Sequence, residues 1–151
     1  MKEKIKSPED IIIIAQQLKK GLKKIVIASG CFDIMHRGHL NMLFQAKKQG
    51  DFLIVLVNND ESVRRYKGGH HPIIGEKDRV LLLSALECVD YAVLFSQLSP
   101  ISIIKKIKPD VYCNGLDWEQ KIMKRYSGRI HIIKRTKGVS TTNIIEKISQ
   151  L

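Results

Sequence analysis

The apolar residues 25–28 lead into a loop-like segment, residues 30–39 (Gly-Cys-Phe-Asp-Ile-Met-His-Arg-Gly-His), and then into a helix-like segment, residues 40–48. A short apolar run bounded by a glycine is typical of a buried strand. A strand that passes through a loop into a helix begins a crossover, because parallel strands can be joined only by a long connection. This segment therefore favours a parallel α/β sheet over other folds open to a chain of this length.

The alternation of strands and helices continues along the chain. Residues 52–58 form a near-continuous apolar run, which predicts a strand buried on both faces. Residues 59–67 are polar and are expected to be irregular or briefly helical. Together these patterns predict a doubly wound, Rossmann-like α/β fold, with a five-stranded parallel sheet and helices on both faces. The strands are expected at residues 24–29, 52–58, 91–95, 111–113 and 129–134, and the main helices at residues 7–20, 37–49, 76–87, 99–107 and 140–148.

Length and composition fit one domain. The 151 residues are 44% hydrophobic and 27% charged, which is typical of a globular chain with its own core. We expect a single domain, residues 1–151, made of an N-terminal helical segment (1–22) and an α/β core (23–151). The chain contains no run long enough to cross a bilayer and its start lacks the apolar region of a signal peptide, so we expect a cytoplasmic protein without a membrane partner.

The net charge of +11 restricts the partners. A strong positive charge suits nucleic acid, an anionic membrane surface or small, highly charged substrates. Nucleic-acid binders usually add aromatic stacking platforms, and only 6% of these residues are aromatic. We therefore expect phosphorylated small molecules rather than nucleic acid as partners. A non-catalytic, basic nucleic-acid-binding domain remains an alternative.

Two imidazoles, His36 and His39, stand where the loop becomes the helix. Ligands of open α/β sheets bind at the carboxyl ends of the strands, and a helix N-terminus there favours phosphate. Gly38, between the two histidines, lets a phosphate approach the backbone closely. Both imidazoles could act as catalytic donors to a transferring phosphoryl group, and a neighbouring phosphate would favour their protonated form. A lone histidine here would more often be a surface or capping residue, but the pair indicates a polyphosphate site.

The same loop offers further groups for nucleotide binding. Backbone N–H groups of Ser29, Gly30 and Phe32 could donate to phosphate oxygens, and Cys31 lies among them. Asp33 is expected to contact the nucleotide and the substrate by orienting a donor or a metal-bound water. The alternative for Asp33 is a carboxylate that caps the loop.

A second group of hydroxyls, Ser140, Thr141 and Thr142, follows about a hundred residues later. Hydroxyls at a helix N-cap, with free N–H groups behind them, can bind phosphate. Such a cap alone is also common at helix starts that bind no ligand. Arg135 and Lys137 come just before and could screen a triphosphate. Both segments resemble parts of one enzyme superfamily, and this resemblance implies that they converge on one nucleotide.

Two further cations are candidates for phosphate binding. Lys67 precedes two glycines and is expected to contact the substrate and to act in catalysis, with a plain surface lysine as the alternative. Arg79 stands at a helix start, where a cation is unfavourable to the helix dipole, and is expected to bind the substrate phosphate. His70 and His71 are adjacent histidines without further ligands, which is a weak signal for a metal.

The residues after the fourth predicted strand are candidates for recognition of the nucleoside. Asn114, Gly115 and Asp117 are expected to bind the nucleotide, with Asp117 accepting from the ribose hydroxyls. Trp118 could flank the base. A loop turn with a partly buried tryptophan is the alternative reading of this segment.

The segment from His36 to His39 resembles the His-x-Gly-His motif of the nucleotidyltransferase superfamily, and the Ser140–Thr142 cap matches its distal phosphate-binding element. The resemblance implies transfer of a nucleoside monophosphate from a triphosphate to a phosphorylated small molecule, with release of pyrophosphate. It also implies Mg²⁺ bound with the triphosphate rather than by the protein alone, and it suggests a homodimer.

Within that superfamily the chain most resembles the heptose 1-phosphate adenylyltransferase domain of lipopolysaccharide precursor synthesis. This resemblance implies transfer of AMP from ATP to D-glycero-D-manno-heptose 1-phosphate. It covers almost everything after Lys23, and residues 30–39, 58–68, 78–91, 107–110 and 140–148 carry it.

This chain departs from that family's pattern at two places, so a second pair of substrates remains an alternative. Members of that family usually have Lys-Gly-Gly-Asp-Tyr where this chain has residues 114–118, and Arg-Pro where it has His71 and Pro72. Residues 117–119 and 135–138 instead resemble glycerol-3-phosphate cytidylyltransferase, which uses CTP. The base and the acceptor therefore stay open between these two alternatives.

Overall fold

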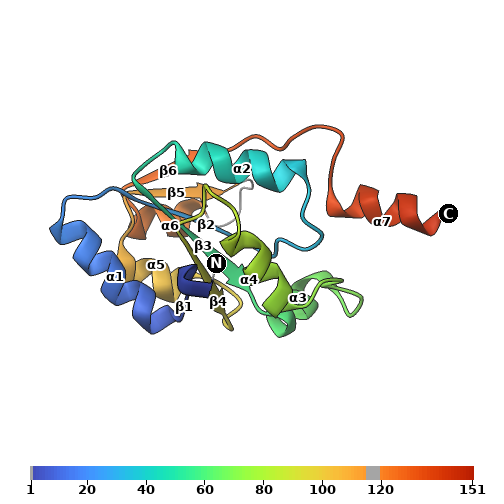
Figure 1. Cartoon of the computed structure of the whole chain (residues 1–151), viewed down its shortest axis with the longest axis horizontal. Coiled ribbons are helices and arrows are strands. Elements are labelled where there is room, and N and C mark those ends of the chain that lie inside the picture. The colour runs from blue at the N-terminus through green and yellow to red at the C-terminus, as the bar shows by residue number, and fades with distance from the viewer. Residues whose placement is uncertain (1, 115–119) are drawn as a thin grey trace.

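The computed structural model describes residues 2–114 and 120–151 (Figure 1). In these residues the strands form one six-stranded, fully parallel sheet in the order β1-β4-β3-β2-β5-β6. From β2 the chain proceeds to β3 and β4 on one side and then returns to β5 on the other, so the strand order reverses at β2. The strands are β1 (Ile5–Lys6), β2 (Ile25–Gly30), β3 (Phe52–Asn58), β4 (Tyr91–Phe95), β5 (Val111–Asn114) and β6 (Arg129–Ile132).

Helices cover both faces of the sheet (Figure 1). Side chains of α2 and α4 pack in one apolar cluster, and side chains of α1, α5 and α6 pack in the other. Helix α7 extends away from the sheet, and none of its residues is buried. The helices are the 3₁₀ turn η1 (Lys2–Lys4), α1 (Pro8–Lys20), α2 (Arg37–Lys47), α3 (Asp60–Lys67), α4 (Glu76–Ser84), α5 (Ile101–Ile107), α6 (Gln120–Tyr126) and α7 (Thr141–Ser149).

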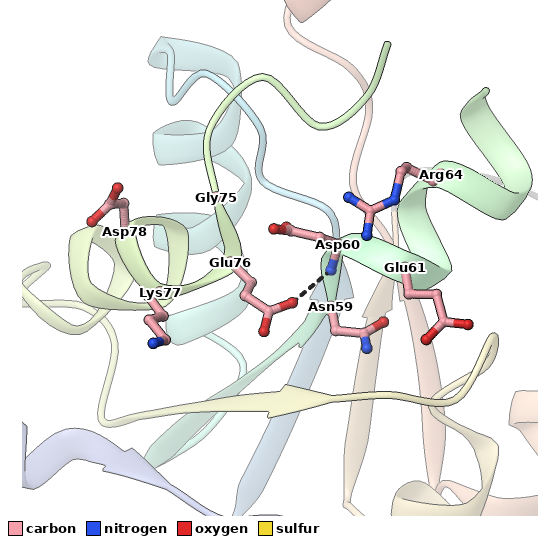
Figure 2. Close-up of a pocket in the computed structure, with 8 residues that line it drawn as sticks. All are labelled: Asn59, Asp60, Glu61, Arg64, Gly75, Glu76, Lys77 and Asp78. Carbon is pink, nitrogen blue, oxygen red and sulfur yellow. Dashed lines mark hydrogen bonds between the residues drawn. The ribbon is translucent and has the colours of Figure 1, made fainter. Parts of the chain in front are cut away.

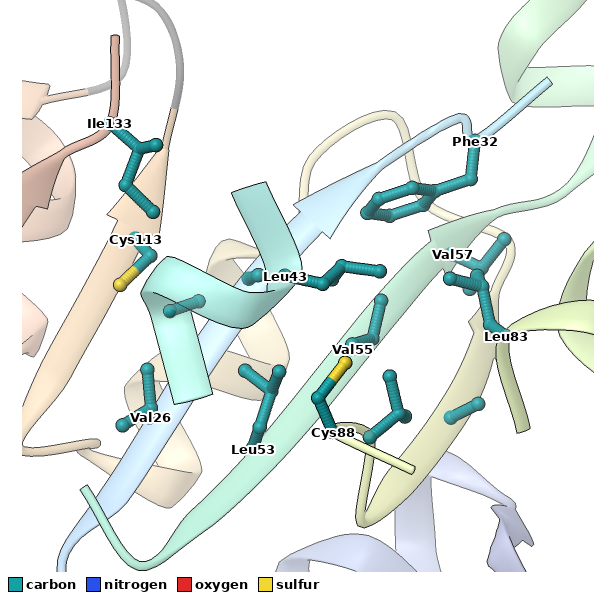
Figure 3. Close-up of a cluster of buried hydrophobic side chains, with 14 of the residues drawn as sticks. Val26, Phe32, Leu43, Leu53, Val55, Val57, Leu83, Cys88, Cys113 and Ile133 are labelled. Atoms are coloured by element: carbon teal, nitrogen blue, oxygen red, sulfur yellow. The ribbon is translucent and has the colours of Figure 1, made fainter. Parts of the chain in front are cut away.

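The apolar strands divide their side chains between the two clusters. Val55 and Val57 of β3 face the cluster that contains Leu43 of α2 and Leu83 of α4, as Figure 3 shows. The alternate residues, such as Leu56, join the cluster on the opposite face. This period of two, with both faces buried, explains why β3 reads as an unbroken apolar run.

The predicted doubly wound α/β fold is confirmed, with one strand more than expected. The extra strand, β1, contributes Ile5 and Lys6 to the edge beside β4. Lys4 Nζ donates to the backbone oxygens of Val89 at 2.7 Å and Leu86 at 3.1 Å, which anchors the N-terminal segment there. A strand of two residues has too little periodicity to be recognised from sequence.

Local capping accounts for the helix starts. Ser7 accepts from the Asp10 backbone N–H at 3.0 Å at the start of α1, as the sequence indicates. The polar segment after β3 forms a full helix, α3, because Asn59 caps it through the Ser62 N–H at 2.9 Å. The sequence did not predict α6, which packs Met123 into the core. Within the described residues, no helix is long and apolar enough to span a membrane.

Candidate active site

The loop after β2 delivers both histidines to the start of α2. His36 is the N-cap of α2, and its Nδ1 accepts from the Gly38 backbone N–H at 3.1 Å. The rings of His36 and His39 stack, with centroids 3.9 Å apart and planes inclined by 20°. A neutral imidazole that accepts at Nδ1 carries its proton on Nε2, where it can be donated. His36 is therefore a capping residue and a candidate donor at once.

The surroundings of both imidazoles favour the neutral form. Burial lowers the pKa of His39 to about 4, and the nearby charges of His36 and Lys67 act in the same direction. Burial also lowers the pKa of His36. His39 Nδ1 is buried and has no hydrogen-bond partner in the described part of the chain. An anion beside the rings would reverse this balance by favouring their charged forms.

The segment before α7 reaches the same place as the histidines. Arg37 Nη2 donates to the Lys137 backbone oxygen at 3.3 Å, and Asn41 Nδ2 donates to Thr136 Oγ1 at 3.2 Å. Helix α2 thus holds this segment beside its own first turns. A cavity of about 320 Å³ lies between them. Its lining includes His36, Gly38, His39, Lys67, Arg135, Ser140, Thr141 and Thr142, all of them predicted site residues.

The predicted hydroxyl cap has the expected geometry. Ser140 has extended backbone and its side chain accepts from the Asn143 backbone N–H at 3.1 Å, which makes it the N-cap of α7. Thr141 and Thr142 form the first turn behind it. A helix start of this kind presents free N–H groups and hydroxyls to the cavity, both of which suit phosphate oxygens.

A second cavity, of about 230 Å³, adjoins the first, because His39, Met42, Lys67, Arg135 and Thr141 line both. Its floor is the loop that follows β2. The two cavities therefore form one continuous site at the carboxyl end of β2. The end of β2 and this loop line it with Ser29, Gly30, Cys31, Phe32 and Asp33, which are the residues predicted to bind the nucleotide there.

Asp33 borders this site, but its carboxylate already accepts hydrogen bonds from backbone N–H groups. It is 1% exposed and accepts from the N–H groups of Ile73 and Ile74, both at 2.9 Å, and of Ile34 at 3.1 Å. Burial disfavours its charge, but these hydrogen bonds outweigh burial and hold the pKa of Asp33 below its usual value. His71 Nδ1 lies 3.5 Å from the same carboxylate. This is the loop-capping role that the sequence left open as the alternative.

Arg79 does not line either cavity, in contrast to the sequence-based expectation. Its side chain is fully buried and donates to the backbone oxygens of Cys31, Asn58 and Ile74, and to the carboxylate of Asp60. The guanidinium thus faces the protein's own oxygens rather than a substrate phosphate. These contacts explain a cation in the first turn of α4 despite the unfavourable helix dipole.

Asn114 is the last residue of β5, the neighbour of β2 in the sheet. Gly115, Asp117 and Trp118 lie outside the described residues. Their expected contacts with the nucleoside remain predictions.

Residues 27–147 match the model of the cytidylyltransferase-like family. The chain belongs to this family. The matched span contains both histidines and the Ser140–Thr142 cap, which line one cavity. Membership identifies the chain as a nucleotidyltransferase, as the His-x-Gly-His resemblance implied.

Two curated relatives and one solved structure extend this comparison. The bifunctional protein HldE of Helicobacter hepaticus is 44% identical over 99% of this chain, and that of Pelobacter propionicus is 38% identical over 96%. The chain spans about a third of the length of these relatives, 31% of each. The crystal structure of a lipopolysaccharide core biosynthesis protein from Thermoplasma volcanium has a TM-score of 0.65 at 32% identity, covering 76% of this chain and 99% of that one.

Some residues that line the site of this cytidylyltransferase-like chain were not predicted. Met42 lines both cavities, and Thr136 and Val139 line the larger one. Met42 follows His39 by three residues, so helical spacing on α2 could have placed it on the same face. Thr136 and Val139 carry no comparable signal, because they reach the cavity through the path of an irregular segment.

A third cavity, of about 600 Å³, lies between α3 and the start of α4 (Figure 2). Its lining is rich in carboxylates, and Glu76 Oε2 accepts there from the Asp60 backbone N–H at 2.7 Å. Acidic side chains would repel a triphosphate, so this cavity does not suit the nucleotide. Among the described residues there is also no group of three or more His, Cys, Asp or Glu side chains suited to a metal ion.

We expect the binding of a nucleoside triphosphate to take up protons. Its phosphates would raise the lowered pKa of the His39 imidazole, whose Nδ1 has no hydrogen-bond partner among the described residues, so the bound state holds more protons than the free state near neutral pH. Affinity should therefore increase as the pH falls from 8 toward 6. Titration calorimetry without acceptor, in two buffers of different ionisation enthalpy, measures the uptake. His39→Ala should take up fewer protons, and equal uptake by both proteins would contradict the assignment.

Proposed function

We propose that this nucleotidyltransferase transfers AMP from ATP to D-glycero-D-manno-heptose 1-phosphate and releases pyrophosphate. The convergence of the His36 and His39 loop with the hydroxyl-capped start of α7 on one site carries the proposal. Lys67 and Arg135 add positive charge to that site, the complement of a triphosphate. The heptose acceptor is supported by the sequence resemblance described above and by the likeness to a lipopolysaccharide core biosynthesis protein.

The proposed reaction is an in-line displacement at the α-phosphorus of ATP. An oxygen of the acceptor phosphate forms the new bond to phosphorus, and the bond to the bridging oxygen breaks, so that pyrophosphate leaves with the electron pair. His36 and His39 would donate hydrogen bonds to the charge that develops around phosphorus. Backbone N–H groups of Gly30 and Phe32, together with the start of α7, would orient the nucleotide.

The side chains present suit Mg²⁺ carried by the triphosphate rather than a protein cage. Asp33 is the one carboxylate among the described residues that line the two joined cavities, and both its oxygens already accept backbone N–H groups. Mg²⁺ often binds through a few carboxylates together with substrate phosphates. When bound, the ion would neutralise charge on the departing pyrophosphate.

A second candidate is transfer of CMP from CTP to glycerol 3-phosphate. It is favoured by the segment Arg135–Gly138, which resembles the glycerol-3-phosphate enzyme and reaches the cavity through Arg135 and Thr136. The two candidates share the reaction and the phosphate-binding residues. They differ in the base and in the acceptor.

A substrate panel separates the two candidates. We expect pyrophosphate release from ATP only with Mg²⁺ and the heptose 1-phosphate, and little from CTP with glycerol 3-phosphate. The reverse pattern would move the assignment to the second candidate. Salt-sensitive binding to DNA or RNA, with no turnover of any triphosphate, would instead favour the nucleic-acid-binding alternative.

We further propose that residues 1–151 act as one nucleotidyltransferase domain in the cytoplasm, where ATP and sugar phosphates are available. The homodimer suggested by the family resemblance is a separate prediction. Light scattering of the purified chain tests it.

A further inference from the structure

Arg79 is among the largest fully buried side chains of the protein, although it carries a charge. A buried guanidinium is costly unless its N–H groups find acceptors. Arg79 Nε donates to the Ile74 backbone oxygen at 2.9 Å, and Nη2 donates to the Asn58 oxygen at 2.8 Å and to Asp60 Oδ1 at 2.7 Å. Nη1 donates to the Cys31 backbone oxygen. Four acceptor oxygens thus surround one side chain.

These acceptors come from three separate segments at the carboxyl edge of the sheet. Cys31 belongs to the loop after β2, Asn58 and Asp60 to the junction of β3 and α3, and Ile74 to the segment before α4. Asp33 adds a second contact between the loop after β2 and the segment before α4, because it accepts from the Ile73 and Ile74 N–H groups. The Ile74 residue is therefore bound through both its N–H and its carbonyl oxygen.

The loop that Arg79 holds has an unfavourable backbone conformation. Phe32 has φ +52° and Ile34 has φ +25°, both in the left-handed region that side chains with a Cβ rarely adopt. Such residues persist only where the surroundings hold them in place. The Cys31 carbonyl precedes this stretch, and the Asp33 carboxylate lies within it. The same loop continues to His36 at the start of α2.

We propose that Arg79 is a positioning residue for the nucleotidyl-transfer site. Its hydrogen bond to the Cys31 carbonyl positions the loop that carries the histidines. Its ion pair with Asp60 positions helix α3, which ends at Lys67. It reaches the reacting groups only through these elements. The catalytic consequence rests on the proposed function, whereas the structural consequence does not.

The test is Arg79→Lys, which keeps the charge but replaces a planar fork of donors with a single ammonium that cannot reach all three segments. We expect kcat to fall by about tenfold or more, with the KM for the triphosphate changed by less than about threefold. Misplacement of the catalytic groups reduces stabilisation of the transition state more than it reduces binding of the triphosphate. Hydrogen exchange of the Ile73 and Ile74 amides should accelerate by about tenfold, while amides of β3 keep their protection.

A matched control, Ile104→Val, weakens the core on the opposite face of the sheet without touching these segments. It should leave exchange at Ile73 and Ile74, and kcat, close to those of the unchanged protein. If Arg79→Lys does not fold, Asp60→Asn removes the ionic partner and should give the same local changes at smaller size.

The proposal is overturned if exchange at Ile73 and Ile74 is unaltered, if exchange rises equally throughout the core, or if it rises locally without loss of kcat. A chain that releases no pyrophosphate with any triphosphate would refute the proposed function instead. In that case the exchange measurement still decides whether Arg79 holds the loop.

Discussion

His39→Ala should lower turnover by about 10²- to 10³-fold while the protein stays folded, because removal of one preorganised donor from a developing charge costs about this much. His39 lines both joined cavities and stacks on His36, so its loss removes a donor from the centre of the site. The imidazole stands on the first turn of α2, and alanine is compatible with that helix. Pyrophosphate release at saturating substrates measures the change, and circular dichroism monitors the fold.

The matched control is His70→Ala. His70 is exposed and lines none of the cavities that contain His39. It should retain turnover within about twofold of the unchanged protein, since surface substitutions away from special contacts have small effects. Equal activity of the His39 and His70 variants would remove His39 from the catalytic centre and with it the proposed geometry.

Gly38→Ala is expected to lower kcat by about 10- to 100-fold with little loss of stability. A Cβ at Gly38 would lie 2.9 Å from both Nδ1 and Cε1 of the His36 ring, and 3.4 Å from Val139 Cγ1. The ring must move, which breaks the Nδ1 hydrogen bond to the Gly38 N–H and the stacking on His39. A misplaced catalytic group by itself can cost about this much.

The stability cost of Gly38→Ala should be small for two reasons. The contact is with a side chain that can turn away, and alanine favours a helix over glycine by up to about 1 kcal/mol. Gly69→Ala is the control, because a Cβ there meets nothing within 4 Å. Thermal unfolding and kcat are measured for both variants. A Gly38→Ala protein with full kcat would show that the His36 ring position does not matter for turnover.

The parts of the fold that sequence predicted well depend on local patterns. The caps at Ser7 and Ser140 and the apolar run of β3 are each readable within a few residues, because capping and burial act over one turn or one strand. The His36 and His39 pair was predicted in the same way, from a strand, a loop and a helix start that follow one another. The predicted union of this pair with Ser140 came from the family resemblance, and the structure brings them to one cavity.

The polar residues whose contacts sequence could not reveal are those whose partners lie far away along the chain. Arg79 was expected at the substrate phosphate, but the carbonyls of Cys31 and Asn58, 48 and 21 residues distant, enclose it. The Asp33 carboxylate likewise meets the Ile73 and Ile74 amides, 40 and 41 residues on. Neither contact has a periodic or capping signal that could reveal it.

The order of the amino acids was thus sufficient to predict a parallel α/β core, several of its helix caps and a candidate phosphate site built on two histidines, because periodicity and capping are short-range properties. Folding in three dimensions determined which polar groups face the cavity and which hold it together. His36 and His39 line the candidate site, whereas Arg79, and Asp33 at the border of the site, bind the backbone of its loops. A buried charge takes whichever oxygens and N–H groups packing brings within reach.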